Sequence, residues 1–165
     1  MKVDFFLSDC TEPTRTDEKF GICDDQDGQK AYTDHTDNEK WGAIVRNENL
    51  KEVKFIAIDN CIIILREASN DKESTCDGML TFEDTLYLVE LKVQRSEWIK
   101  KSVEQLENTM KLLHDNHDLT KFRFKKAFAC NRKHPHFITI DNERNKRFFQ
   151  TYGFRMDVQA EIVVK

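Results

Sequence analysis

The stretch 76–92 restricts the fold of this chain more than any other segment. It contains two runs of mostly apolar residues, separated by the polar pair Glu83-Asp84. This pattern predicts a β-hairpin, and a two-residue turn at the polar pair makes Phe82 face Thr85. Because side chains alternate between the two faces of a strand, this register decides which residues of the two arms lie side by side.

In that register Asp77 lies directly opposite Glu90, and Lys92 follows on the same face of the second strand. Opposed carboxylates repel each other and their apolar neighbours add a desolvation cost, so at least one pKa should be raised. A bound cation or the Lys92 ammonium would relieve the repulsion. Carboxylate oxygens suit Mg²⁺ or Mn²⁺, which can polarise a phosphodiester and lower the pKa of a water molecule. Lys92 could then orient that water or offset the developing negative charge.

The pattern Asp77-Gly78 followed by Glu90-Leu91-Lys92 resembles the PD-(D/E)xK nuclease superfamily, with Cys76 where the family often has proline. The resemblance covers roughly residues 59–131. It implies that the Asp and the Glu bind Mg²⁺ or Mn²⁺ and that the Lys assists hydrolysis. It also implies an accessory catalytic role for Gln105, because many members carry a polar residue on the helix after the third strand. The implied substrate is nucleic acid, with DNA as the default and RNA as the alternative.

Each part of this pattern also has an ordinary interpretation. Glu-x-Lys is common on the polar face of an exposed strand, Asp-Gly is common in turns, and Gln105 fits a surface glutamine equally well. The chain could therefore be a non-catalytic interaction protein on the same fold, such as an immunity or antitoxin-like factor, or a subunit of a larger complex. Whether it is an enzyme stays open, with a metal-dependent nuclease as the leading hypothesis.

The residues after the hairpin predict a helix and then a parallel strand. Over 97 to about 114, apolar residues recur at alternating spacings of four and three, and Ser96 can cap the helix. This stripe consists of Ile99, Val103, Leu106, Met110 and Leu113. A strand over 126–130 follows, and since a helix between two strands is a crossover, this strand should run parallel to the Glu90 strand.

The remaining elements complete an α/β or α+β fold with a mixed central sheet, which the resemblance implies is restriction-endonuclease-like. The segment 60–67 suits either a short helix capped by Asp59 or a strand. A helix over 143–152, begun at Asp141-Asn142 and ended by Gly153, precedes a closing strand over 154–165.

Residues 1–58 precede the nuclease-like region and should form an antiparallel β elaboration on a core of residues 59–165. At 165 residues the whole chain suits a single domain. Asp27-Gly28 predicts a hairpin turn within the N-terminal part. The neighbouring Asp24 and Asp25 do not fit a calcium loop, because Asp34 stands where that loop needs a Glu, so we expect a solvated turn.

Charge is unevenly distributed along the chain, which has a net charge of -4. Counted from the sequence, residues 1–90 carry a net -11 and residues 91–165 a net +7. A local basic surface suffices for phosphate contacts, so nucleic acid is the expected partner. The candidate contacts are Arg132, Lys133, Arg144 and Arg147. Alternatively, the two halves only complement each other's charge when they pack.

The five cysteines include no Cys-x-x-Cys pair, so we expect reduced, mostly buried thiols in a cytoplasmic protein. No stretch approaches the roughly 20 apolar residues of a membrane span, and we expect no membrane association. Cys130, His134 and His136 are zinc ligands by type, but their spacing is not that of a zinc site. A protein partner or a homodimer is compatible with the sequence.

Overall fold

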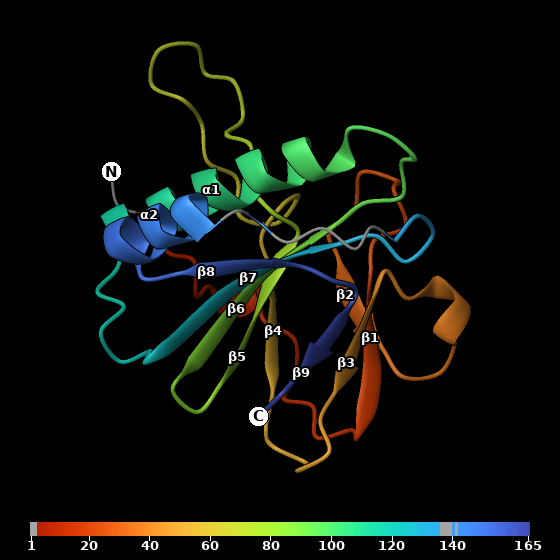
Figure 1. Cartoon of the computed structure of the whole chain (residues 1–165). Coiled ribbons are helices and arrows are strands. Elements are labelled where there is room, and N and C mark those ends of the chain that lie inside the picture. Colours follow the sequence, from red (N-terminus) through yellow and green to blue (C-terminus); the bar gives the residue numbers. More distant parts are fainter. Residues whose placement is uncertain (1–2, 136–139, 141) are drawn as a thin grey trace.

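The computed structural model describes residues 3–135, 140 and 142–165. In this part of the chain, two α-helices and two mixed β-sheets form an α/β arrangement (Figure 1). Helices α1 (Trp98–Asn116) and α2 (Asn142–Tyr152) lie on the same side of the larger sheet. Short 3-10 turns, η1 (Ser8–Cys10) and η2 (Asn38–Lys40), interrupt the N-terminal third.

The larger sheet has five strands, and its middle strands are buried on both faces. Its order is β4 (Lys54–Ala57), β5 (Gly78–Phe82), β6 (Thr85–Leu91), β7 (Phe124–Cys130) and β8 (Arg155–Val158). Strands β4, β5 and β6 are antiparallel neighbours, whereas β6, β7 and β8 run parallel. Every residue of β6 is buried, as expected for a strand covered on both sides.

One face of this sheet packs against the helices and the other against the smaller sheet. On the helical side, Leu86 and Leu88 of β6 join one apolar cluster with Leu106 of α1 and Phe148 of α2. The smaller sheet has the order β2 (Tyr32–Asp34), β1 (Lys19–Cys23), β3 (Ala43–Arg46) and β9 (Glu161–Val163). Residues of that sheet form the second cluster with the opposite side of β6, which includes Val89.

The predicted hairpin register is confirmed, because Phe82 pairs with Thr85 and Gly78 with Val89. The helix that follows is also confirmed, and its predicted apolar stripe faces the core. Ser96 does not cap it, since the capping position is Glu97 in a left-handed conformation without a side-chain hydrogen bond. The parallel pairing of β7 with β6 is as predicted.

The second helix begins at Asn142 and ends before Gly153, whose φ of +80° and hydrogen bond to the Phe149 carbonyl confirm its predicted role. Asp141, with which we expected this helix to begin, lies outside the described residues. The prediction of a single closing strand over 154–165 is wrong. The chain forms β8 in the larger sheet and then β9 in the smaller one, because the backbone of Gln159 bonds to Ala129 and that of Ala160 to Ile44.

The segment 60–67 is neither the short helix nor a regular strand. The amides of Cys61 and Ile62 both bond to the Ile58 carbonyl in a tight turn, and an isolated bridge then joins Leu65 to Lys72. Ile62 and Ile64 are buried in the core, whereas Ile63 and Leu65 are exposed, so burial accounts for only part of the apolar run.

The N-terminal residues form the expected antiparallel strands, and the Asp27-Gly28 turn separates β1 from β2. Two strands pair with the sheet on the other side of the proposed boundary at residue 58. Strand β4 belongs to the larger sheet, and β9, from the end of the chain, pairs in parallel with β3. The division between the two sheets therefore does not coincide with that boundary.

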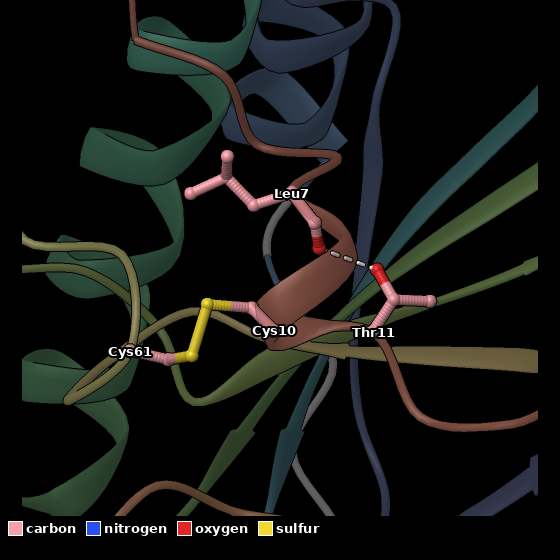
Figure 2. The surroundings of a disulfide bond; sticks show 4 residues. All are labelled: Leu7, Cys10, Thr11 and Cys61. Atoms are coloured by element: carbon pink, nitrogen blue, oxygen red, sulfur yellow. Dashed lines mark hydrogen bonds between the residues drawn. A yellow bond between two sulfur atoms is a disulfide. The ribbon is translucent and has the colours of Figure 1, made fainter.

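Cys10 and Cys61 form a disulfide, so the prediction of reduced thiols is wrong for these two residues (Figure 2). Their Cα atoms are 5.9 Å apart although 51 positions separate them in the sequence. Figure 2 shows that the bond ties the η1 turn, where the Thr11 hydroxyl donates to the Leu7 carbonyl, to the segment after β4. The other three cysteines are free and buried.

None of the helices in the described ranges has the length and apolar character that crossing a membrane requires.

Loss of the disulfide should lower the free energy of unfolding by about 2–4 kcal/mol, because the bond closes a long loop and restricts the unfolded chain. We expect this in urea unfolding of the wild type with and without a reductant. A Cys10→Ser, Cys61→Ser double variant is the control, since the reductant should leave its stability unchanged. Equal stability of the oxidised and reduced wild type would contradict the prediction.

Candidate functional site

The hairpin register brings the two predicted carboxylates together at one end of the larger sheet. Asp77 directly precedes β5, and Glu90 lies near the end of β6. The Asp77 amide donates to Glu90 Oε1 at 3.1 Å, and the Leu91 amide donates to Asp77 Oδ2 at 2.7 Å. Each carboxylate is thus held by the backbone of the opposite strand.

Both carboxylates are buried, and an ammonium group lies next to one of them. Asp77 is 6% exposed and Glu90 2%. Lys92 Nζ is 2.9 Å from Glu90 Oε2, and the lysine side chain is 14% exposed. The alternative of Glu-x-Lys on an exposed polar face is therefore wrong for this strand.

The Asp-Gly pair is not a turn either, because Gly78 is the first residue of β5. A Cβ atom on this glycine would lie 2.4 Å from Cζ of Phe55 and 2.9 Å from the Ile56 carbonyl. The neighbouring strand β4 thus approaches too closely for any side chain at residue 78. This packing holds Asp77 in line with the strand.

Burial raises the pKa of both carboxyl groups. The pKa of Glu90 rises to about 7, because desolvation outweighs the opposing effect of the Lys92 charge and hydrogen bond. The pKa of Asp77 rises well above its usual range through desolvation and then through the charge of Glu90. In the absence of a bound cation, the pair therefore holds a proton around neutral pH.

Two further carboxylates act on this pair, and the sequence assigned neither to it. The charge of Asp24 contributes to the raised pKa of Asp77, and that of Asp59 to the raised pKa of Glu90. Asp59 follows β4 and pairs with Lys72 at 2.7 Å. Asp24 follows β1 of the other sheet, so only the packing of the two sheets brings the predicted solvated turn to the site.

Gln105 does not contact the carboxylates but supports the backbone that precedes Asp77. Its Nε2 atom donates to the Thr75 carbonyl at 3.2 Å. One turn later on α1, the Thr109 hydroxyl accepts the Cys76 amide at 2.9 Å. Helix α1 therefore holds the segment before Asp77 in place, and the role that fits Gln105 is positioning.

A cavity of about 520 Å³ opens beside Lys92. Its lining combines Asp24 and Trp41 with two basic residues of the loop after β7, Arg132 and Lys133. The lining includes Lys92 but neither Asp77 nor Glu90, so Lys92 is the member of the trio that reaches the cavity. A larger cavity, of about 850 Å³, contains none of the predicted site residues.

The structure separates the four basic residues that were predicted to contact phosphate. Arg132 and Lys133 line the cavity, and Arg132 Nη1 also donates to the carbonyls of Asn38 and Trp41 at 2.9 Å. Arg144 and Arg147 lie instead on α2, over the ring of Phe148. Of the four, only Arg132 and Lys133 therefore line the cavity.

The carboxylate pair fits a magnesium or manganese ion in its chemistry. Mg²⁺ usually takes one or two carboxylates and keeps several waters, and a cation would replace the proton that Asp77 and Glu90 share. The described residues contain no group of three or more His, Cys, Asp or Glu side chains placed to hold a metal ion. Of the residues considered for zinc, Cys130 is a free, buried thiol, and His136 lies outside the described residues.

Comparisons with known proteins found no matching family model, no matching curated protein and no matching solved structure. Interpretation of the site therefore depends on its geometry and chemistry.

Asp77→Asn should increase the free energy of unfolding at pH 8 by about 1–2 kcal/mol, because the neutral amide removes a buried charge and can still accept the Leu91 amide. The folded-state pKa values lie above the unfolded ones. Wild-type stability should therefore fall as the pH rises from about 4 through about 7.

Urea unfolding at pH 5.5 and pH 8 tests this prediction. The difference between variant and wild type should be larger at pH 8. Asp71→Asn, at an exposed position in the loop before the site, is the control and should change neither value. A wild type equally stable at both pH values would contradict the assignment of a shared proton.

Proposed function

We propose that this protein is a metal-dependent nuclease that hydrolyses phosphodiester bonds, with DNA as the expected substrate and RNA as the alternative. The observation that carries the proposal is the buried pair Asp77 and Glu90. The two residues lie directly opposite each other on neighbouring strands, beside the Lys92 ammonium. A pair of carboxylates next to a lysine that reaches a cavity is the set of groups that such hydrolysis uses.

The energetic cost of this arrangement supports a functional reading. Two carboxylates buried side by side destabilise the folded chain, and apolar residues in their place would pack the end of the sheet without that cost. Perturbed pKa values of this kind concentrate at functional sites. A divalent cation would neutralise the pair and so turn the unfavourable contact into a binding site.

In this mechanism Asp77 and Glu90 would hold the Mg²⁺ or Mn²⁺ ion, which when bound would polarise the phosphodiester and lower the pKa of a water molecule. Lys92 reaches the cavity and is placed to orient the attacking water or to stabilise negative charge that develops on the phosphate. Lys133 and Arg132 on the same cavity would contact an anionic substrate, and the cavity is also lined by Asp24, Asp25 and Glu39. Gln105 acts indirectly, through the Thr75 carbonyl.

A restriction-endonuclease-like arrangement is part of the proposal. The antiparallel order β4, β5, β6, followed by the crossover helix α1 and the parallel strand β7, supports it. In this reading, β1, β2, β3 and β9 form an addition that covers the second face of the sheet and contributes Asp24 to the cavity.

A non-catalytic interaction protein, of the immunity or antitoxin type or as a subunit of a complex, is the second candidate. The ion pair between Lys92 and Glu90 favours it, because a shared proton and an ammonium already satisfy the two carboxylates.

A cytoplasmic location is part of the nuclease proposal, whereas the Cys10–Cys61 bond is typical of an oxidising compartment.

Binding of Mn²⁺ should require Asp77 and should release protons, because the ion replaces the proton of the carboxyl pair. Affinity should rise as the pH increases through about 7, the pKa of Glu90, because the ion binds the deprotonated carboxyl groups. Calorimetry in buffers of different ionisation enthalpy measures both effects. Undiminished binding by Asp77→Ala would place the ion elsewhere, and no binding by the wild type would favour the second candidate.

Cleavage of supercoiled, linear and single-stranded DNA and of RNA should depend on Mg²⁺ or Mn²⁺. It should decrease by about 100-fold or more in Lys92→Ala and Asp77→Ala, because each removes a group that acts in the transition state. Lys54→Ala, at the exposed first residue of β4, is the matched lysine control and should cleave like the wild type. Equal cleavage by all four proteins would point to a contaminating nuclease.

A further inference from the structure

The basic charge of the second half of the chain gathers at the end of the larger sheet that lies away from the carboxylates. Residues 119–126 contain four Lys or Arg and no Asp or Glu, and residues 142–155 contain four and one. Because β7 and β8 are parallel neighbours, the two segments meet, with Lys126 as the register partner of Arg155. Sequence order alone separates these residues by about thirty positions.

Two large aromatic side chains are exposed at this end of the sheet, Phe124 on the face of β7 that carries Phe128 and Phe149 on α2 at the opposite face, and a guanidinium group lies over each ring. Phe124, at the start of β7, is 55% exposed, and Phe149 on α2 is 50% exposed. The Arg123 guanidinium lies 5.4 Å from the centre of the Phe124 ring, and that of Arg155 lies 4.6 Å from the centre of the Phe149 ring. Each ring therefore has one accessible aromatic face next to a cation, an arrangement on which an unstacked base can stack.

Lys146 lies three positions before Phe149 on α2, and residues three apart on a helix are neighbours on one face. Lys146 therefore extends the surface by one helical turn. We call the set of Arg123, Phe124, Lys126, Lys146, Phe149 and Arg155 the basic aromatic surface.

Little of this positive charge is compensated by nearby carboxylates. Asp157 pairs with Lys126 at 3.1 Å, and this is the ion pair within the surface. At the adjacent hairpin tip, the Asp84 carbonyl accepts the Phe124 amide, while Glu83 pairs with Lys51. Among the residues that the structure describes, no carboxylate lies within 4.0 Å of the charged groups of Arg123, Lys146 or Arg155.

We propose that the basic aromatic surface binds single-stranded nucleic acid. Unstacked bases would stack on Phe124 and Phe149 with their guanidinium groups, while Lys146 and the arginines contact phosphates. A duplex offers the same phosphates but keeps its bases stacked, so it should bind more weakly. The proposed partner therefore matches both the charge and the exposed rings.

This site is separate from the carboxylate pair. Phe124 is the register partner of Thr85 and Ala129 that of Glu90, so five residues of strand, about 17 Å, lie between the two ends. Binding should accordingly need neither a metal ion nor Asp77, and it does not depend on the nuclease proposal. If the protein is a nuclease, the surface holds the strand at a distance from the bond that is cut.

Fluorescence anisotropy with labelled oligodeoxythymidylate, in EDTA and over a series of salt concentrations, tests the proposal. Arg123→Gln, Arg155→Gln should weaken binding about tenfold or more and reduce the slope of affinity against salt, because phosphate contacts are lost. Phe124→Leu, Phe149→Leu should also weaken binding about tenfold or more but leave the salt slope unchanged, because only stacking is lost.

The matched control is Lys19→Gln, Lys30→Gln, which removes two exposed cations from the N-terminal part of the chain and should bind like the wild type. Equal losses in the control and the arginine variant would overturn the proposal, as would wild-type binding that is no tighter to the single strand than to a duplex. Unchanged binding by the phenylalanine variant, with heparin as an equally good ligand, would show a general polyanion surface instead.

Discussion

The candidate site depends on the pairing of Phe82 with Thr85 across the two-residue turn of the β5–β6 hairpin. A shift of this register by one residue would move every side chain of β6 to the other face of the sheet. Glu90 would then face the smaller sheet, away from Asp77. In the observed register each carboxylate accepts a backbone amide of the opposite strand, so the same hydrogen bonds that hold the strands together also orient the acids. Helix α1 adds to this by binding both the carbonyl and the amide of the peptide bond between Thr75 and Cys76.

Burial changes the pKa values of the two carboxyl groups. An exposed pair of carboxylates would repel weakly and titrate near its ordinary pKa, whereas this pair lies at the end of a strand buried on both faces. Both raised pKa values follow from desolvation first, and the charge of Glu90 raises the pKa of Asp77 further. Lys92 offsets part of the cost for Glu90 and reaches the cavity as well. The proton of the pair, the lysine and the cavity together define what a cation and an anionic substrate would meet.

The two halves of the chain differ in charge, and the fold does not simply set one half against the other. The acidic half contributes Asp24 and Asp59 near the carboxylates, whereas much of the basic charge lies around the starts of β7 and β8. This segregation along the larger sheet comes from its topology, because parallel neighbours place the starts of both strands at one end. The acidic and basic regions are thus available for different partners, a cation at one end and a phosphate chain at the other.

Local sequence was sufficient for features that depend on spacing. The alternation of the hairpin, its polar pair and the apolar stripe of α1 predicted the strands, their register, the crossover helix and the opposition of Asp77 to Glu90. Features that depend on contacts between distant segments were not predictable. The Cys10–Cys61 bond, the place of Asp24 and the division of residues 154–165 between two sheets each require the packing of elements that no spacing relates. By itself the sequence determined which residues face each other within one hairpin, because strand and turn geometry are local. Only the tertiary structure decided how deeply they are buried and which distant charges surround them, because burial is a property of the whole packed chain.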